Sequence, residues 1–124
     1  MISDIIHIIK QQGNDVHYDN FIVRVMAADM LDMDNAGDMR IFLITLIKGG
    51  VKKIVIDMTG LDFIDSSGIG VLIDAAKHLR QHGGDIVILS MPERVQIIVQ
   101  PVRLNRFIKI FEREDEVIYF FRHV

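Results

Sequence analysis

Apolar and polar positions along this chain predict strands and helices in alternation. Ile54-Val55-Ile56 and Ile86-Val87-Ile88-Leu89 are continuous apolar runs, which are typical of strands covered on both faces. Between them, residues 67–82 form the clearest helical pattern, which stops at Gly83-Gly84. A strand-helix-strand order is a crossover unit, so the two strands should be parallel. The inner stripe of this helix is Ile69, Leu72, Ile73, Ala76 and Leu79.

The pattern before this unit is less regular. Residues 35–48 place apolar side chains on one helical face and end at Gly49-Gly50. Phe21–Met26 reads as a strand, and Asp19-Asn20 predicts a tight hairpin that joins it to Val16-His17-Tyr18. Residues 27–34 read as irregular.

The first dozen residues allow two interpretations. Ile2, Ile5, Ile6 and Ile9 have helical spacing, whereas Ile8 interrupts that stripe and keeps a strand open.

Three elements follow the second apolar run. Pro92 to Gln100 reads as a short helix with Ser90 as a candidate cap, residues 107–111 as a last strand, and residues 114–121 as a last helix. The sum predicts an α/β fold with a mixed sheet of about four or five strands, an N-terminal hairpin, parallel crossovers and about four packed helices. We expect one domain over residues 1–124, with 1–12 as a candidate N-terminal extension.

Composition narrows the class of protein. The 124 residues are 50% hydrophobic and 25% charged, which is enough for a conventional core. Cysteine is absent, which excludes disulfides and thiolate sites. The net charge of −3 and the lack of a basic stripe argue against nucleic acid as a partner. No apolar run approaches the about 20 residues of a membrane helix, and no signal peptide is recognised, so we expect a cytoplasmic protein without direct membrane insertion.

Other candidate metal-binding and nucleotide-binding motifs lack residues that such sites require. His78 and His82 lie four residues apart, but no third metal ligand is evident, so a solvated helix face is the better interpretation. Residues 32–43 resemble a calcium loop only at their start, because Leu43 stands where a glutamate is needed. Gly68-Ile69-Gly70 lacks the third glycine of a dinucleotide fingerprint. The late cations Arg103, Arg106, Lys109 and Arg113 read as a solvated rim. We therefore predict no metal, no cofactor and no enzymatic activity.

The segment Asp65-Ser66-Ser67-Gly68-Ile69-Gly70 carries the most information. It places two hydroxyls at the start of the clearest helix, where backbone N–H groups lack partners and favour anions. The serines could cap the helix, or one of them could accept a phosphate. Asp65 or Ser66 could bind the first-turn N–H groups, and Gly68 and Gly70 leave room for a kinase to approach the backbone.

With that loop after the strand Ile54-Val55-Ile56-Asp57-Met58, the chain resembles a STAS domain of the anti-sigma factor antagonist type. The resemblance covers about residues 16–121 and is strongest over 51–111. It implies a binding module whose second motif serine, Ser67, is phosphorylated by a serine kinase that is also an anti-sigma factor. A PP2C-type phosphatase would reverse this modification.

The same resemblance assigns roles to neighbouring residues. Ser66 is the second candidate for phosphorylation, and Asp65, Ser66, Gly68 and Gly70 shape the loop. Asp32 and Ile69 are the implied partner contacts. The family usually has Gly-Glu-Leu-Asp where this chain has Asp29-Met30-Leu31-Asp32, in a segment that normally contributes to partner binding.

That segment is also rich in methionine, with Met26, Met30, Met33 and Met39, which could fill the core or form an adaptable contact surface. The departure from the family pattern motivates an alternative function. In it, the chain is a STAS subunit that docks constitutively in a larger transport or stress-signalling complex and is not phosphorylated.

Overall fold

The computed structural model describes residues 6–10 and 21–123. A mixed sheet has the strand order β1-β2-β4-β6-β7, in which β1 pairs antiparallel with β2 and the other pairs are parallel. Its strands are β1 (Ile6–Lys10), β2 (Phe21–Met26), β4 (Lys53–Asp57), β6 (Asp85–Leu89) and β7 (Ile110–Phe111). The predicted α/β class, with its parallel crossovers, is confirmed.

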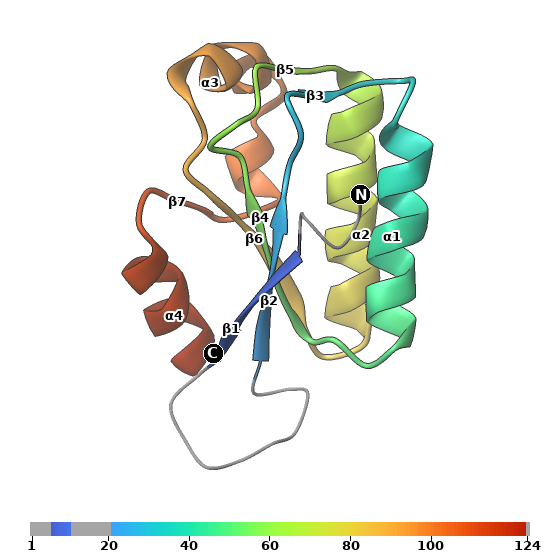
Figure 1. The fold of residues 1–124 in the computed structure, drawn as a ribbon. Helices are drawn as coiled ribbons and strands as arrows, with labels where there is room; N and C mark the ends of the chain where they lie inside the picture. The colour runs from blue at the N-terminus through green and yellow to red at the C-terminus, as the bar shows by residue number, and fades with distance from the viewer. Residues whose placement is uncertain (1–5, 11–20, 124) are drawn as a thin grey trace.

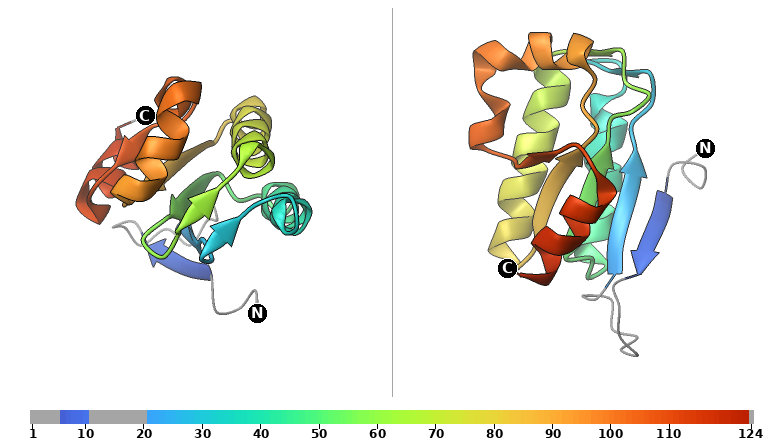
Figure 2. Two further views of the ribbon diagram at one scale, coloured as in Figure 1. Left: turned by 90° about the horizontal axis from the view of Figure 1, so that it is seen from above. Right: turned by 90° about the vertical axis from the view of Figure 1, so that its left-hand side faces the viewer.

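Helices cover both faces of this sheet. Helices α1 and α2 lie on one face and α4 on the other, while α3 and two 3-10 turns cross one end of the molecule (Figures 1 and 2). The helices are α1 (Ala36–Lys48), α2 (Ser66–Gln81), α3 (Glu93–Val99) and α4 (Glu114–Arg122), and the 3-10 turns are η3 (Gln100–Val102) and η4 (Leu104–Arg106).

Alternation along the central strands supplies apolar side chains to both faces. Ile54 and Ile56 of β4 pack toward α1 and α2, whereas Val55 packs with Val117 and Phe121 of α4. All three β4 side chains are fully buried. This explains why the strand reads as a continuous apolar run rather than an alternating one.

Several predicted elements need correction. Residues 6–10 form a strand, so the helical interpretation of that part is wrong, while residues 2–5 and 11–12 lie outside the described residues. The strand Phe21–Met26 is confirmed, but its antiparallel partner is β1. Residues 16–20, which carry the predicted tight turn, lie outside the described residues.

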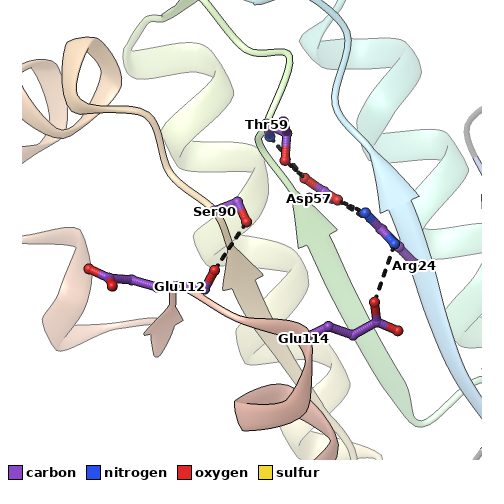
Figure 3. A network of polar contacts seen from close by, with 6 residues as sticks. All are labelled: Arg24, Asp57, Thr59, Ser90, Glu112 and Glu114. Atoms are coloured by element: carbon purple, nitrogen blue, oxygen red, sulfur yellow. Dashed lines mark hydrogen bonds and ion pairs between the residues drawn. The ribbon is translucent and has the colours of Figure 1, made fainter.

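Three further differences concern short segments. Residues 27–34 are not wholly irregular, because β3 (Met30–Leu31) pairs in parallel with β5 (Phe63–Ile64) to form a second, two-stranded sheet. The last strand is only Ile110–Phe111. Ser90 does not cap α3: it adopts a left-handed φ of 59°, its hydroxyl donates to the Glu112 carbonyl at 3.3 Å, and Pro92 occupies the N-cap position (Figure 3).

The buried carboxylate of Asp57 lies at the end of β4 that leads on to β5. Asp57 is fully buried, and its Oδ1 accepts hydrogen bonds from the N–H and hydroxyl of Thr59 at 2.9 and 2.6 Å (Figure 3). Its Oδ2 accepts from Nε of Arg24 on β2 at 2.8 Å. Arg24 also forms an ion pair with Glu114 of α4 at 3.7 Å. The network therefore joins two strands, a loop and a helix.

These contacts determine the titration of the carboxyl group. Burial raises the pKa of Asp57, but the hydrogen bonds from Thr59 and Arg24 together outweigh burial and hold the pKa below the ordinary value of 3.8. Asp57 is therefore expected to remain ionised in the folded protein at neutral pH.

The start of α2 lies very close to the β3–β5 sheet at Gly68. A Cβ atom built on Gly68 would lie 2.5 Å from the Leu31 carbonyl oxygen and 2.9 Å from Cγ1 of Ile64. A Cβ on Gly70, one half-turn later, would meet nothing within 4 Å. Packing therefore requires glycine at position 68 and does not require it at position 70.

We predict that Asp57→Asn lowers the free energy of unfolding at neutral pH by about 1.5–3 kcal/mol, because it weakens hydrogen bonds to a buried charge. The pKa of Asp57 is lower in the folded than in the unfolded state. Its contribution is therefore present above pH 3.8 and is lost as the pH falls through the folded-state pKa. Urea unfolding over this pH range measures the change.

The matched control is Asp74→Asn, which removes an exposed ion pair to Arg40 with a separation of 3.4 Å. Its cost should stay below about 1 kcal/mol. Equal costs for the two variants would contradict the role given to Asp57.

We also predict opposite effects for two glycine substitutions in α2. Gly68→Ala should destabilise the protein by about 1–3 kcal/mol, because the new methyl group meets backbone and core atoms. Gly70→Ala should be neutral or stabilising by up to about 1 kcal/mol, since alanine is the better helix former and the space is open. Thermal or urea unfolding of both variants decides this, and a harmless Gly68→Ala would refute the close approach.

Candidate functional site

The side chain of Asp65 organises the loop between β5 and α2. Asp65 is the N-cap of α2, and its Oδ1 accepts a hydrogen bond from the Gly68 N–H at 3.1 Å. Its Oδ2 accepts from the Met33 N–H at 3.0 Å, and its own N–H donates to the Leu31 carbonyl at 3.2 Å. One carboxylate therefore holds both the first turn of the helix and the segment that follows β3.

Ser66 and Ser67 are the first two residues of α2, and both side chains are exposed. Neither hydroxyl forms a hydrogen bond within the described part of the chain, and neither backbone N–H donates to another described residue. The capping role considered for Ser66 is thus filled by Asp65 alone. Two free hydroxyls and two free N–H groups lie together at the positive end of a 16-residue helix.

Charges around the serines are mainly negative. Asp62, just before β5, lies beside the loop and pairs with Nε of Arg94 on α3 at 2.7 Å. Both members of this pair are exposed, so water screens their attraction. The carboxylate of Asp65 adds a second negative charge next to the serines. Any additional anion on a serine would therefore gain from the helix start and lose from these carboxylates.

The two predicted partner contacts differ in accessibility. Asp32 lies near the loop and is half-buried: its Oδ1 accepts from the Asp34 N–H at 3.0 Å, and its N–H donates to Oδ1 of Asn35 at 2.9 Å. Ile69 is only 8% exposed and belongs to the main core. In this conformation Ile69 can offer little contact area to another protein.

The methionines beside the loop are divided between exposed and partly buried positions. Met33 is 77% exposed and Met30 is also exposed, whereas Met26 and Met39 are partly buried. A small apolar groove of about 170 Å³ lies between the start of β3 and α1. It is lined by Met26, Ala28, Met30, Leu31, Met39 and Phe42, with Asn35 and Asp38 at its polar positions. The loop therefore borders an apolar surface.

No cluster of three or more histidine, cysteine or acidic side chains suited to a metal occurs among the described residues. His78 and His82 contact each other, with ring centroids 4.8 Å apart, and Nδ1 of His82 lies 2.9 Å from the His78 carbonyl. No helix in the described ranges is long and apolar enough to cross a membrane.

Sequence reasoning missed the polar network at Asp57. A signal was present, because an aspartate directly follows the apolar run of β4 and an arginine interrupts the apolar residues of β2. Their pairing depends on strand order, which places Arg24 opposite Val55 on the neighbouring strand.

Comparison with known proteins agrees with this geometry. The family model described as "STAS domain" matches residues 9–117. A Thermotoga neapolitana protein named "Putative anti-sigma factor antagonist TM1081 homolog" is 26% identical over 98 residues, which cover 78% of this chain and 87% of the relative.

Solved structures share the fold. The anti-sigma factor antagonist SpoIIAA in its unphosphorylated form superposes with a TM-score of 0.73 at 22% identity, covering 96% of this chain and 97% of that one. The phosphorylated form of SpoIIAA from Bacillus gives a TM-score of 0.63 at 22% identity, covering 93% and 97%.

A transporter contains the same fold as one part of a longer chain. The murine anion transporter Slc26a9 superposes with a TM-score of 0.68 at 17% identity, over 83% of this chain and 18% of the transporter. The family model spans most of the present chain, including the Asp65–Gly70 loop, and the fold superposes on those of its structural neighbours. This chain belongs to the STAS domain family.

Proposed function

We propose that this protein is a non-enzymatic anti-sigma factor antagonist that is switched by phosphorylation of Ser67. The observation that carries the proposal is the exposed, unbonded hydroxyl of Ser67 on a first helical turn that Asp65 holds in place. Its free hydroxyl is accessible to a kinase, and the rigid turn presents it without local unfolding. The partner is a serine kinase that acts as an anti-sigma factor, a PP2C-type phosphatase removes the phosphate, and the process is cytoplasmic.

The physical basis of the switch is charge. A phosphoserine carries about −1.5 to −2 charges at neutral pH. The free N–H groups of Ser66 and Ser67 and the helix dipole partly offset this charge, so the fold should survive modification. The exposed side chains of Met30, Met33 and Phe63 lie in the β3 and β5 segments beside the loop. A dianion among them would have to be desolvated in a complex, which is costly unless the partner supplies a cation.

The choice of Ser67 over Ser66 rests on the family resemblance. Ser66 and Ser67 are equally free of hydrogen bonds, so accessibility does not separate them. The family resemblance favours the second serine of the motif. Ser66 serves as the internal comparison when the phosphorylated residue is identified.

A second function is favoured by the match to Slc26a9, in which the fold forms part of a transporter. In that case the chain docks constitutively in a larger assembly and Ser67 carries no phosphate.

We predict that incubation with the partner kinase and ATP adds one phosphate to Ser67. Peptide mass spectrometry should locate it there in the wild type and in Ser66→Ala, and should find none in Ser67→Ala. Phosphate on Ser66 alone, or none in the wild type under conditions in which the kinase modifies another substrate, would refute the assignment.

We further predict that Ser67→Asp weakens kinase binding at least tenfold, equivalent to about 1.4 kcal/mol, because it places an anion in the contact surface. Titration calorimetry measures the affinity, and Gln81→Asp, at the exposed far end of α2, is the control for added charge. Unchanged affinity of Ser67→Asp would favour constitutive docking.

A further inference from the structure

The surface formed by residues 94–109 has a charge opposite to that of the whole protein. From Arg94 to Phe111 the chain contains four cations and no acidic residue, although the net charge of the protein is −3. This stretch comprises most of α3, both 3-10 turns and β7. We call residues 94–109 the basic arch.

The four cations of the arch differ in whether they contact another charged or aromatic side chain. Arg94 pairs with Asp62, and Nζ of Lys109 lies 5.9 Å from the centroid of the Phe120 ring. Arg103 and Arg106 are exposed and form no ion pair with any described residue. Two adjacent turns thus present uncompensated guanidinium groups to solvent.

Large apolar side chains are exposed among these cations. They are Ile97 on α3, Val102 on η3 and Phe107 directly after η4. Ile97 is 65% exposed, and Nζ of Lys77 from α2 lies 5.9 Å from the centroid of the Phe107 ring, which adds a cation. Val95, Val99 and Leu104 are buried and attach the arch to the core.

A second exposed apolar region has acidic neighbours. The apolar groove described above, between β3 and α1, is called the Met groove. The exposed Met30 and Met33 lie beside it, and Asp29, Asp34 and Asp38 nearby form no ion pair with described residues. These two exposed apolar regions of the described chain therefore carry opposite charge. Figure 2 shows α3 and the following turns at one end of the fold.

We propose that the basic arch is a docking surface for an anionic lipid membrane. Arginine side chains attract acidic headgroups, and exposed aliphatic and aromatic side chains enter the boundary between headgroups and acyl chains. The three apolar side chains come from three short elements with cations between them. Lipids can rearrange around such an irregular surface, whereas a folded acidic protein would need a matching shape.

The arch would hold the protein at the membrane by surface contact alone, since no described helix could span a bilayer. The acidic segment that carries Asp29, Asp34 and Asp38 would be repelled by the same membrane, which favours one orientation of the bound protein. Docking through the arch does not depend on phosphorylation of Ser67.

The test is co-sedimentation of the full chain with vesicles of phosphatidylcholine alone and of phosphatidylcholine mixed with phosphatidylglycerol. Binding is expected only to the mixed vesicles and should decline as salt is added. Because each arginine near an anionic surface contributes about 1 kcal/mol, Arg103→Glu/Arg106→Glu should weaken partitioning at least about 30-fold. Lys48→Glu/Arg122→Glu, with the same change in net charge, should weaken it much less.

Two isoleucines give a matched test of the apolar contribution. Ile97→Ser should weaken vesicle binding, whereas Ile41→Ser, at a side chain of nearly equal exposure, should not. Circular dichroism should show that every variant remains folded. No binding to mixed vesicles, equal binding to both vesicle types, or equal effects of the two serine variants would overturn the proposal. Binding to polyglutamate without binding to vesicles would overturn it in favour of an acidic protein partner.

Discussion

The contact between the start of α2 and the β3–β5 sheet determines how the site is built. Gly68 lies so close to Leu31 that no larger residue fits without movement, and the Asp65 carboxylate joins the same two segments through Gly68 and Met33. The position of the two serines is therefore fixed by backbone packing and by one carboxylate. Their own hydroxyls contribute no hydrogen bond to this arrangement and remain available for chemistry.

Charge divides the surface into regions that suit different partners. The loop and the Met groove are bordered by aspartates, and the basic arch lies across α3. The Arg94–Asp62 ion pair joins the two regions, because Arg94 belongs to the arch and Asp62 lies beside the serine loop. Under the two proposals made above, the loop would meet a protein partner and the arch a membrane, through separate sets of side chains.

Much of the fold could be predicted because its central elements carry strong local signals. The apolar runs of β4 and β6 and the stripe of α2 fix the crossover unit regardless of the rest of the chain. The short pairing of Met30–Leu31 with Phe63–Ile64 was missed because two residues do not make a pattern, and the pairing depends on where the β4–β5 loop returns.

The site was predicted less completely than the fold. The sequence indicated the loop and offered Asp65 or Ser66 as the cap of α2, and the structure shows that Asp65 is the cap. The sequence also suggested that Gly68 leaves room for a kinase to approach, whereas Gly68 is buried against the core. The cause is a tertiary contact, since only the position of Leu31 reveals why Gly68 must lack a side chain. The Arg24–Asp57 pair was missed for the same kind of reason, because it depends on strand order.

The contiguity of β4, α2 and β6 has a consequence for folding kinetics. These elements pack together within residues 53–89, whereas β1 joins the sheet at its edge through pairing with β2. The unit buries a shared apolar core within one continuous stretch of chain, so we expect it to form early in folding. The serine loop lies inside this unit, but Leu31 and Met33, which hold it, come from outside, so the loop would reach its final position only when β3 docks.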